Sequence, residues 1–151
     1  MSWRTCSRRR PTSCRSHDRF PRACRRGALA DTSLFIAIEQ ELPLSSQPRD
    51  SVAVSVITVA ELWLGVLAAR DGPTRARRLG TLSAAASLDP LPVDDAVAHA
   101  WAALRVALRD AGKTMPINDS WIAATAIAND LAVASQDGDD DEVPGLRVIR
   151  V

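Results

Sequence analysis

Residues 27–40, GALADTSLFIAIEQ, decide the fold. A short apolar run over residues 28–30 ends in Asp31, two hydroxyl residues follow, and a second apolar run then has helical spacing. This pattern favours a strand at about residues 28–31 and a helix at about residues 33–40. An ionised carboxylate between a buried strand and a buried helix requires an explanation. A single Asp at such a position is an ordinary helix cap, so the explanation depends on whether acidic residues recur at the ends of other strands.

The same alternation of strand and helix continues along the chain. VAVSV (52–56) indicates a second strand, residues 58–69 a helix, and residues 74–86 an arginine-rich helix. SLDPLPVDD (87–95) contains a short extended segment and ends in Asp94, an expected N-cap. The helix that follows ends at Gly112. Its apolar stripe consists of Val97, Trp101, Leu104 and Leu108.

The last third of the chain adds one helix and two strands. A helix is expected from Asn118 or Asp119 to about residue 128, and LAVAS (131–135) and LRVIRV (146–151) have the composition of strands. Strands that alternate with helices predict an α/β fold, an α/β/α sandwich around a parallel sheet of about four to five strands. Ligands of such sheets bind beyond the carboxyl ends of the strands.

Four acidic residues lie where strands end or helices begin. Asp31 ends the first strand, and Glu61 lies one turn into TVAELWLGVLAA (58–69). Asp119 opens NDSWIAATAIA (118–128), and Asp137 follows the strand LAVAS. Because the carboxyl ends of parallel strands meet at one edge of a sheet, we expect these four carboxylates to converge.

Each acid also has a purely structural interpretation. Asp31 or Ser33 has the character of an N-cap, and Thr58-x-x-Glu61 has the form of a capping box. Asn118 and Asp119 together resemble an N-cap followed by an acid that the helix dipole favours. Asp137 fits an ordinary turn.

The charges of the four acids, considered together, favour a cation-binding site over four separate structural roles. Glu61 and Asp119 are the only charges on helices that are predicted to be buried nearly all round. Two like charges 4 Å apart repel by roughly 4 kcal/mol at an effective dielectric constant near 20, so a cluster requires a cation. Carboxylates without His or Cys suit Mg²⁺ or Mn²⁺, which can activate a water for phosphodiester hydrolysis.

The first 26 residues differ sharply from the rest of the chain. They carry nine Arg and one Asp, a net charge of +8, whereas residues 27–151 carry ten Lys or Arg and seventeen Asp or Glu, a net charge of −7. With no hydrophobic period, residues 1–26 are expected to be a disordered tail or to result from a start site assigned too far upstream. All three cysteines lie there, and their spacing with His17 fits no usual zinc site. No apolar run is long enough for a membrane helix, so a soluble, cytoplasmic protein is expected.

The ordered motifs resemble those of the PIN-domain family, and within it the VapC-type toxin ribonucleases of bacterial toxin–antitoxin pairs. The resemblance rests on LADTSLFIAIE, VSVITVAELWLGVLAA, LPVDD, INDSWIAATAIA, SQDGD and the closing VIRV, and it covers residues 27–151. It implies a PIN-like fold and an Mg²⁺- or Mn²⁺-dependent endoribonuclease that forms a homodimer and is inhibited by a VapB-type antitoxin.

The resemblance also implies roles for individual residues. Asp31, Glu61, Asp119 and Asp137 map onto the acidic metal-binding quartet of the family, with Asp31 and Asp119 as the most direct ligands. Glu61 and Asp137 would complete the site or orient the water. The neighbours expected around the quartet are Thr32, Ser33 and Asp139.

Two departures from the family pattern leave alternatives open. Ser135 stands where the family usually has Thr, and the loop after it is the acidic run DGDDDE (137–142). The fourth acid is therefore either Asp137 or Asp139, and a catalytically inactive PIN-like binding module is the alternative function. A phosphoacceptor receiver domain fits less well, because it needs a Lys after the last strand and Lys113 is the only lysine.

Two surfaces are candidates for binding partners. One helix face has a basic residue at every fourth position: Arg105, Arg109 and Lys113. This spacing is equally consistent with binding to RNA phosphates and with an ordinary solvent-exposed helix face. A second basic cluster comprises Arg75, Arg77 and Arg78. The helix around Trp63 is apolar on more faces than one sheet buries, so it is expected to contact a second subunit or an antitoxin segment.

Overall fold

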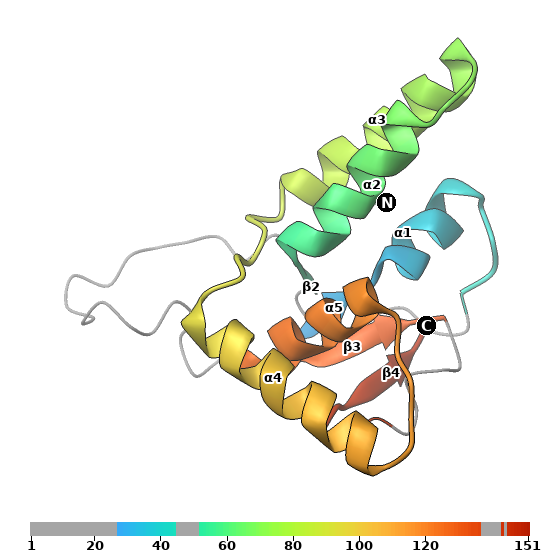
Figure 1. Cartoon of the computed structure of the whole chain (residues 1–151). Helices are drawn as coiled ribbons and strands as arrows, with labels where there is room; N and C mark the ends of the chain where they lie inside the picture. Colours follow the sequence, from blue (N-terminus) through green and yellow to red (C-terminus); the bar gives the residue numbers. More distant parts are fainter. Residues whose placement is uncertain (1–26, 45–51, 137–142, 144) are drawn as a thin grey trace.

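The computed structural model describes residues 27–44, 52–136, 143 and 145–151. Over these residues strands and helices alternate as expected from the sequence, and the chain forms an α/β/α sandwich (Figure 1). The elements are β1 (Ala28–Ala30), α1 (Thr32–Glu39), β2 (Val52–Val54), α2 (Val56–Leu67), α3 (Gly72–Ala86), α4 (Asp95–Asp110), α5 (Ile117–Ala128), β3 (Ala132–Ser135) and β4 (Val148–Arg150). The expected tail over residues 1–26 lies outside the described residues.

The central sheet is parallel and has four strands among the described residues, in the order β2-β1-β3-β4. Ala28 is opposite Val52 on one side and Ala132 on the other, so β1 lies between β2 and β3. The prediction of a parallel sheet with about four to five strands is confirmed. Because β1 and β3 are neighbours, their carboxyl ends, at Ala30 and Ser135, lie at the same edge of the sheet.

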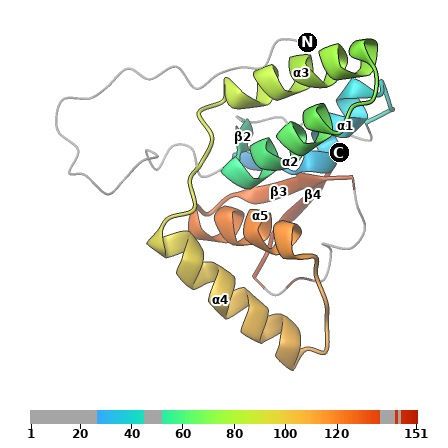
Figure 2. The same cartoon turned by 45° about the horizontal axis from the view of Figure 1, so that its top comes forward.

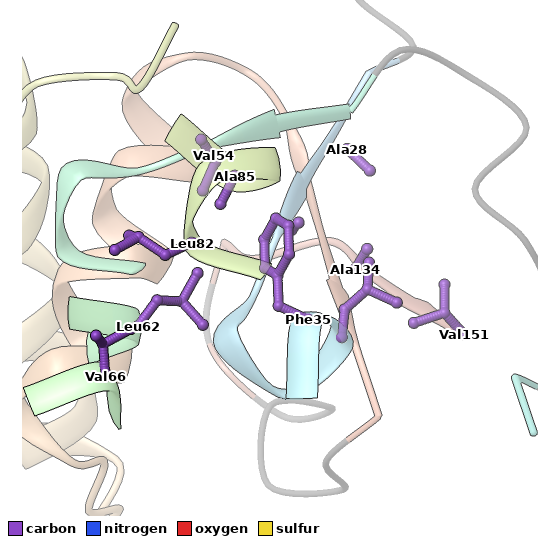
Figure 3. Packing of buried hydrophobic residues seen from close by; sticks show 11 residues of the cluster. Ala28, Phe35, Val54, Leu62, Val66, Leu82, Ala85, Ala134 and Val151 are labelled. Atoms are coloured by element: carbon purple, nitrogen blue, oxygen red, sulfur yellow. The ribbon is translucent and has the colours of Figure 1, made fainter. Parts of the chain in front are cut away.

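Alternate residues of β1 pack on opposite faces of the sheet. Ala28 and Ala30 belong to a cluster with α1, α2 and α3, which Figure 3 shows gathered around Phe35. Leu29 packs on the other face against Ile122 of α5. Helix α4 forms the outer part of that layer, where Leu104 and Leu108 contact α5 (Figure 2). This alternation explains why all three residues of β1 are buried.

Helices α2 and α3 lie side by side and project from the sheet (Figures 1 and 2). Basic side chains of α3 connect the two helices: Arg78 donates to the Gly65 carbonyl at 2.6 Å, and Arg75 donates to the Ala69 carbonyl at 3.0 Å. Arg77 and Thr81 contact the Glu39 carboxylate at the end of α1, at 3.5 and 3.0 Å. The arginine cluster of α3 therefore also holds its neighbouring helices together.

Several expected boundaries shift because the capping residues differ from those predicted. The second strand ends at Val54 rather than 56, and α2 begins at Val56 because Ser55, not Thr58, is its N-cap and accepts from the Thr58 N–H at 3.0 Å. The extended segment near Leu91 is confirmed, since Leu91 bridges Ser55. Helix α4 is capped by Asp94 as predicted, and Gly112 follows it with a φ of +66°.

The prediction that both acid-bearing helices are buried nearly all round is wrong for α2. Trp63, Leu64 and Leu67 are exposed by 48%, 66% and 71%, because α2 projects beyond the sheet and only one of its faces meets α3 and the core. Helix α5 is buried over residues 122–126, as expected for a helix between the sheet and α4. Among the described residues, no helix has both the length and the apolar character needed to span a membrane.

Candidate metal-dependent active site

The site begins at the junction of β1 and α1. The Asp31 N–H donates to the Ala134 carbonyl of β3 at 3.1 Å, which extends the sheet by one bond and fixes the backbone of Asp31. Its side chain is the N-cap of α1 and accepts from the Ser33 N–H at 3.4 Å. Both interpretations of Asp31 thus meet in one residue: it caps a helix, and it places a half-buried carboxylate at the carboxyl edge of the sheet.

The Ser135 hydroxyl bonds the Asp31 carboxylate directly, and the Ser33 hydroxyl lies next to that of Ser135. Ser135, fully buried at the end of β3, donates from Oγ to Asp31 Oδ2 at 3.4 Å and lies 3.4 Å from Ser33 Oγ. The Gln136 N–H donates to Ser33 Oγ at 3.2 Å, which connects the end of β3 to the first turn of α1. Ser135 therefore supplies a hydroxyl group at this edge of the sheet.

Glu61 connects three helices. One carboxylate oxygen, Oε2, accepts a hydrogen bond from Thr32 Oγ1 of α1, and the other, Oε1, accepts from Asn118 Nδ2 of α5 at 2.9 Å. The capping-box interpretation of Thr58-x-x-Glu61 is therefore wrong, because Glu61 points to other helices instead of folding back onto the start of α2. The carboxylate is held from both sides by neutral donors, which fixes its orientation.

Asp119 lies in the first turn of α5, next to the Asn118 that bonds Glu61. The expected cap at Asn118 or Asp119 is wrong: α5 begins at Ile117, its N-cap is Pro116, and no side chain caps it. A connected series of contacts runs from Thr32, beside Asp31, through Glu61 to Asn118, beside Asp119. Three of the four predicted acids thus lie on elements that meet around Glu61.

The donor chemistry fits a hard divalent cation, because the groups gathered here are carboxylate and hydroxyl oxygens. Within the part of the chain that the structure describes, however, no three acidic, His or Cys side chains gather closely enough to hold a metal ion. Asp137 and Asp139, the candidates for the fourth acid, lie outside the described residues. The described acids alone therefore do not form a metal site of this kind.

The basic residues of α4 have partners within the chain. Arg105 Nη1 donates to the Met115 carbonyl at 2.9 Å, and Arg109 pairs with Asp110 at 2.8 Å. Lys113 lies beyond the end of α4 at Asp110, so the prediction that it shares a helix face with Arg105 and Arg109 is wrong, and it too has an interaction within the structure. Arg109 is exposed, whereas part of the Arg105 guanidinium is used to hold the loop before α5.

Sequence reasoning missed two contributors to the site. Asn118 appeared to be a helix cap, but its amide bonds the Glu61 carboxylate, which is 57 residues away in sequence. Ser120 carried no signal as a site residue, yet it is fully buried and accepts a hydrogen bond from Trp101 of α4. Local sequence patterns predict caps from neighbouring residues, so they cannot predict contacts between helices that are distant in the sequence.

The fold and the arrangement of acids define a class of protein. The sequence model of the PIN domain matches residues 28–146, and the chain belongs to the PIN-domain family. It is 47% identical over 131 residues to Ribonuclease VapC4 of Mycobacterium tuberculosis, a match that covers 83% of this chain and 98% of that protein. It is also 46% identical over 125 residues to Ribonuclease VapC5 of the same organism, covering 80% and 93% of the two chains.

Solved structures agree with these relatives. A crystal structure of VapBC-5, a toxin–antitoxin system of M. tuberculosis, matches with a TM-score of 0.71 and 44% identity, covering 83% of this chain and 98% of that one. FitAcB of Neisseria gonorrhoeae matches with a TM-score of 0.64 and 32% identity, covering 82% and 96%. The resemblance to VapC-type proteins of the PIN-domain family is confirmed.

Proposed function

We propose that this chain is a metal-dependent endoribonuclease and the toxin of a toxin–antitoxin pair. The observation that carries the proposal is the arrangement of Asp31, Glu61 and Asp119 on elements that meet at the carboxyl edge of the sheet. Ribonuclease activity is supported by the two VapC relatives, which are similar to this chain over four-fifths of its length. Residues 27–151 form the nuclease domain in this proposal.

Asp31 and Asp119, with Asp137 or Asp139 as the fourth acid, would hold Mg²⁺ or Mn²⁺. Such an ion, when bound, lowers the pKa of a water and neutralises charge that develops on the phosphate. The chain itself contributes orientation. Ser33 and Ser135 hold the Asp31 carboxylate toward the edge of the sheet, and Thr32 and Asn118 leave each oxygen of Glu61 with a lone pair that is free to accept a water proton.

Substrate binding requires positive charge beside this acidic centre. Arg109 and Lys113 remain the candidates for contacting RNA phosphates, with the remaining N–H groups of Arg105. These contacts carry no base specificity, so they bind the backbone of RNA without selecting its sequence.

The proposed protein partners follow from the relatives and from exposed apolar surface. The similar VapBC-5 structure is a toxin–antitoxin system, and an antitoxin of that type is the inhibitor we propose here. Trp63, Leu64 and Leu67 of α2 offer an apolar face for that antitoxin or for a second copy of this chain in a homodimer. An enzyme of this kind would act in the cytoplasm, where its RNA substrates are found.

The test is cleavage of a single-stranded RNA by the full chain, with and without Mg²⁺ or Mn²⁺. We expect cleavage that EDTA abolishes, and Asp119→Asn should reduce the rate by more than about a hundredfold, because a direct ligand matters at least as much as its supporting contacts. Thr125→Val, at a buried site of α5 away from the acids, is the matched control and should cleave normally. No activity with any metal would favour the inactive binding module, whereas equal activity of wild type and Asp119→Asn would exclude Asp119 as a metal ligand.

A further inference from the structure

Two side chains of α4 hold the beginning of α5. Trp101 and Arg105 are four residues apart and lie on the same side of α4. Arg105 Nη1 donates to the Met115 carbonyl at 2.9 Å, and Trp101 Nε1 donates to Ser120 Oγ at 2.9 Å. These bonds fix both ends of a six-residue segment, 115–120, that contains Asn118 and Asp119.

The start of α5 has no side-chain cap of its own. Its N-cap, Pro116, makes no side-chain capping bond, although the first turn of any helix has N–H groups without an intrahelical partner. Ser120 Oγ is buried and donates to the Ile117 carbonyl at 2.6 Å while accepting the bond from Trp101. The hydroxyl of Ser120 is thus a connection between α4 and the first residue of α5.

The indole of Trp101 is itself held in place. Its ring stacks on Trp121 with the centroids 4.4 Å apart and the planes inclined by 6°. Stacking fixes the plane of the indole, and the hydrogen bond fixes the direction of its N–H. Together they set the position and the rotation of the first turn of α5 relative to α4.

We propose that Trp101 is a positioning residue for Asp119, acting through Ser120. This inference rests on the proposed function, in which Asp119 binds the metal. Asp119 directly precedes Ser120, and Asn118 must meet Glu61 Oε1 at 2.9 Å, so a small rotation of this turn displaces both groups. Trp101 is half-buried on α4 and touches neither metal nor RNA in this proposal.

A purely structural role for Trp101 predicts a different outcome. In that case loss of the indole N–H would lower the melting temperature and leave the metal requirement of the folded protein unchanged. A positioning role instead predicts a weaker response to metal at temperatures where the variant is fully folded. The two roles are therefore separated by the metal dependence and by the division of the effect between kcat and KM.

The experiment compares full-length wild type with Trp101→Phe, which keeps an aromatic ring on Trp121 but removes the donor to Ser120. The Mn²⁺ concentration that half-maximally raises the melting temperature and the one for half-maximal RNA cleavage should both rise about tenfold, as is typical when a group that supports a metal ligand is removed. At subsaturating Mn²⁺ kcat should fall, whereas KM for RNA should stay unchanged. Trp101→Leu, which also removes the stacking, should show a larger loss.

Two further variants complete the test. Ser120→Ala removes the same hydrogen bond from the other side and also the bond to the Ile117 carbonyl. Its Mn²⁺ shift should therefore be at least as large as that of Trp101→Phe, and the double variant should show no shift beyond that of Ser120→Ala. Thr125→Val removes a buried hydroxyl bond elsewhere on α5 and should lower the melting temperature without a Mn²⁺ shift. A Mn²⁺ response in Trp101→Phe and Ser120→Ala equal to that of wild type overturns the positioning role. Absence of any Mn²⁺ response in wild type overturns the proposed function instead.

Discussion

Asp31 combines a structural and a chemical role that substitution can separate. As the N-cap of α1, its carboxylate accepts from the Ser33 N–H, and Asn can replace Asp in that role. As a metal ligand in the proposed site, it needs its negative charge, which Asn lacks. The cap is a property of one helix, whereas the charge matters only together with Glu61 and Asp119.

We therefore predict that Asp31→Asn and Asp31→Ala differ in stability but agree in activity. Both should lose RNA cleavage by orders of magnitude, because neither carries the charge. Asp31→Asn should melt near the wild-type temperature without metal, whereas Asp31→Ala should lose about 1 kcal/mol of stability with its cap. Metal-free thermal or urea unfolding measures the difference. Equal stability of the two variants would show that the cap contributes nothing.

Asn118 offers a second test among single residues. Its amide is exposed and donates to Glu61 Oε1, so Asn118→Ala should cost little stability but release one side of the Glu61 carboxylate. We expect kcat for RNA cleavage to fall about tenfold, with KM for RNA unchanged. Initial rates at several RNA concentrations measure both constants. A rise in KM alone would instead make Asn118 an RNA contact.

Single residues also show where prediction from the sequence succeeds and fails. Asp31 was placed correctly, because a strand that ends in an acid before a helix is a local pattern. The hydrogen-bond partners of Glu61 were not predicted, because Thr32 and Asn118 belong to other helices and lie 29 and 57 residues away from Glu61 in the sequence. A Thr-x-x-Glu pattern looks the same whether the Glu caps its own helix or reaches another.

Among the helices, α3 has the cap with the most distinct electrostatic effect. The Thr74 backbone N–H donates to Asp71 at 2.7 Å, and this bond lowers the pKa of the Asp71 carboxyl below 3.8, with smaller contributions from the Thr74 side chain, Arg77 and Arg78. Because the pKa of Asp71 is lower in the folded state than in the unfolded chain, the charged cap stabilises the folded protein at pH values above the unfolded pKa. That stabilisation is lost as the pH falls through the folded value.

Asp71→Asn should remove this pH dependence while keeping a capping side chain. Near neutral pH the variant should be less stable than wild type, and the difference in melting temperature should shrink as the pH falls below 3.8. Melting curves of both proteins over an acid pH series provide the measurement. Parallel curves over the whole series would contradict an ionised cap.

The arginine-rich helix α3 shows that clustered charges in the sequence do not by themselves predict a binding surface. Arg75, Arg77 and Arg78 form a basic cluster in the sequence that suits phosphates, but Arg75 and Arg78 donate to backbone carbonyls of the α2–α3 pair and Arg77 contacts Glu39. Composition records the charge of a side chain, whereas only the folded chain shows which carbonyls lie within its reach. The existence and type of every helix that the structure describes were predicted, and the ends moved by about two residues, as is usual.

For the molecule as a whole, the exposed apolar face of α2 predicts association. Trp63→Glu places a charge in the middle of that face, where Trp63 is 48% exposed and therefore contributes little to the core. We expect the variant to fold normally but to lose dimer formation and antitoxin binding. Size-exclusion chromatography with light scattering, alone and with the antitoxin, measures both. A wild-type chain that stays monomeric, together with normal antitoxin binding by Trp63→Glu, would refute this role.

The overall architecture was predictable because alternating strands and helices permit few arrangements. Ala28 and Ala30 on one face of β1 and Leu29 on the other are all buried, as in a sheet covered by helices on both sides. The projection of α2 and α3 was not predictable. Leu64 and Leu67 have the same apolar character as core residues, but they are exposed because the sheet does not extend as far as they do. The sequence alone does not predict where the sheet ends.

The acidic site is tested most directly by thermal melting of the full chain across a Mn²⁺ series, for wild type and Asp119→Asn. A ligand that binds only the folded state raises its stability as the ligand concentration increases. We predict that the melting temperature of wild type rises steadily with Mn²⁺ and that Asp119→Asn does not respond. If neither protein responds, or if both respond equally, the acids at the edge of the sheet do not form the proposed metal site.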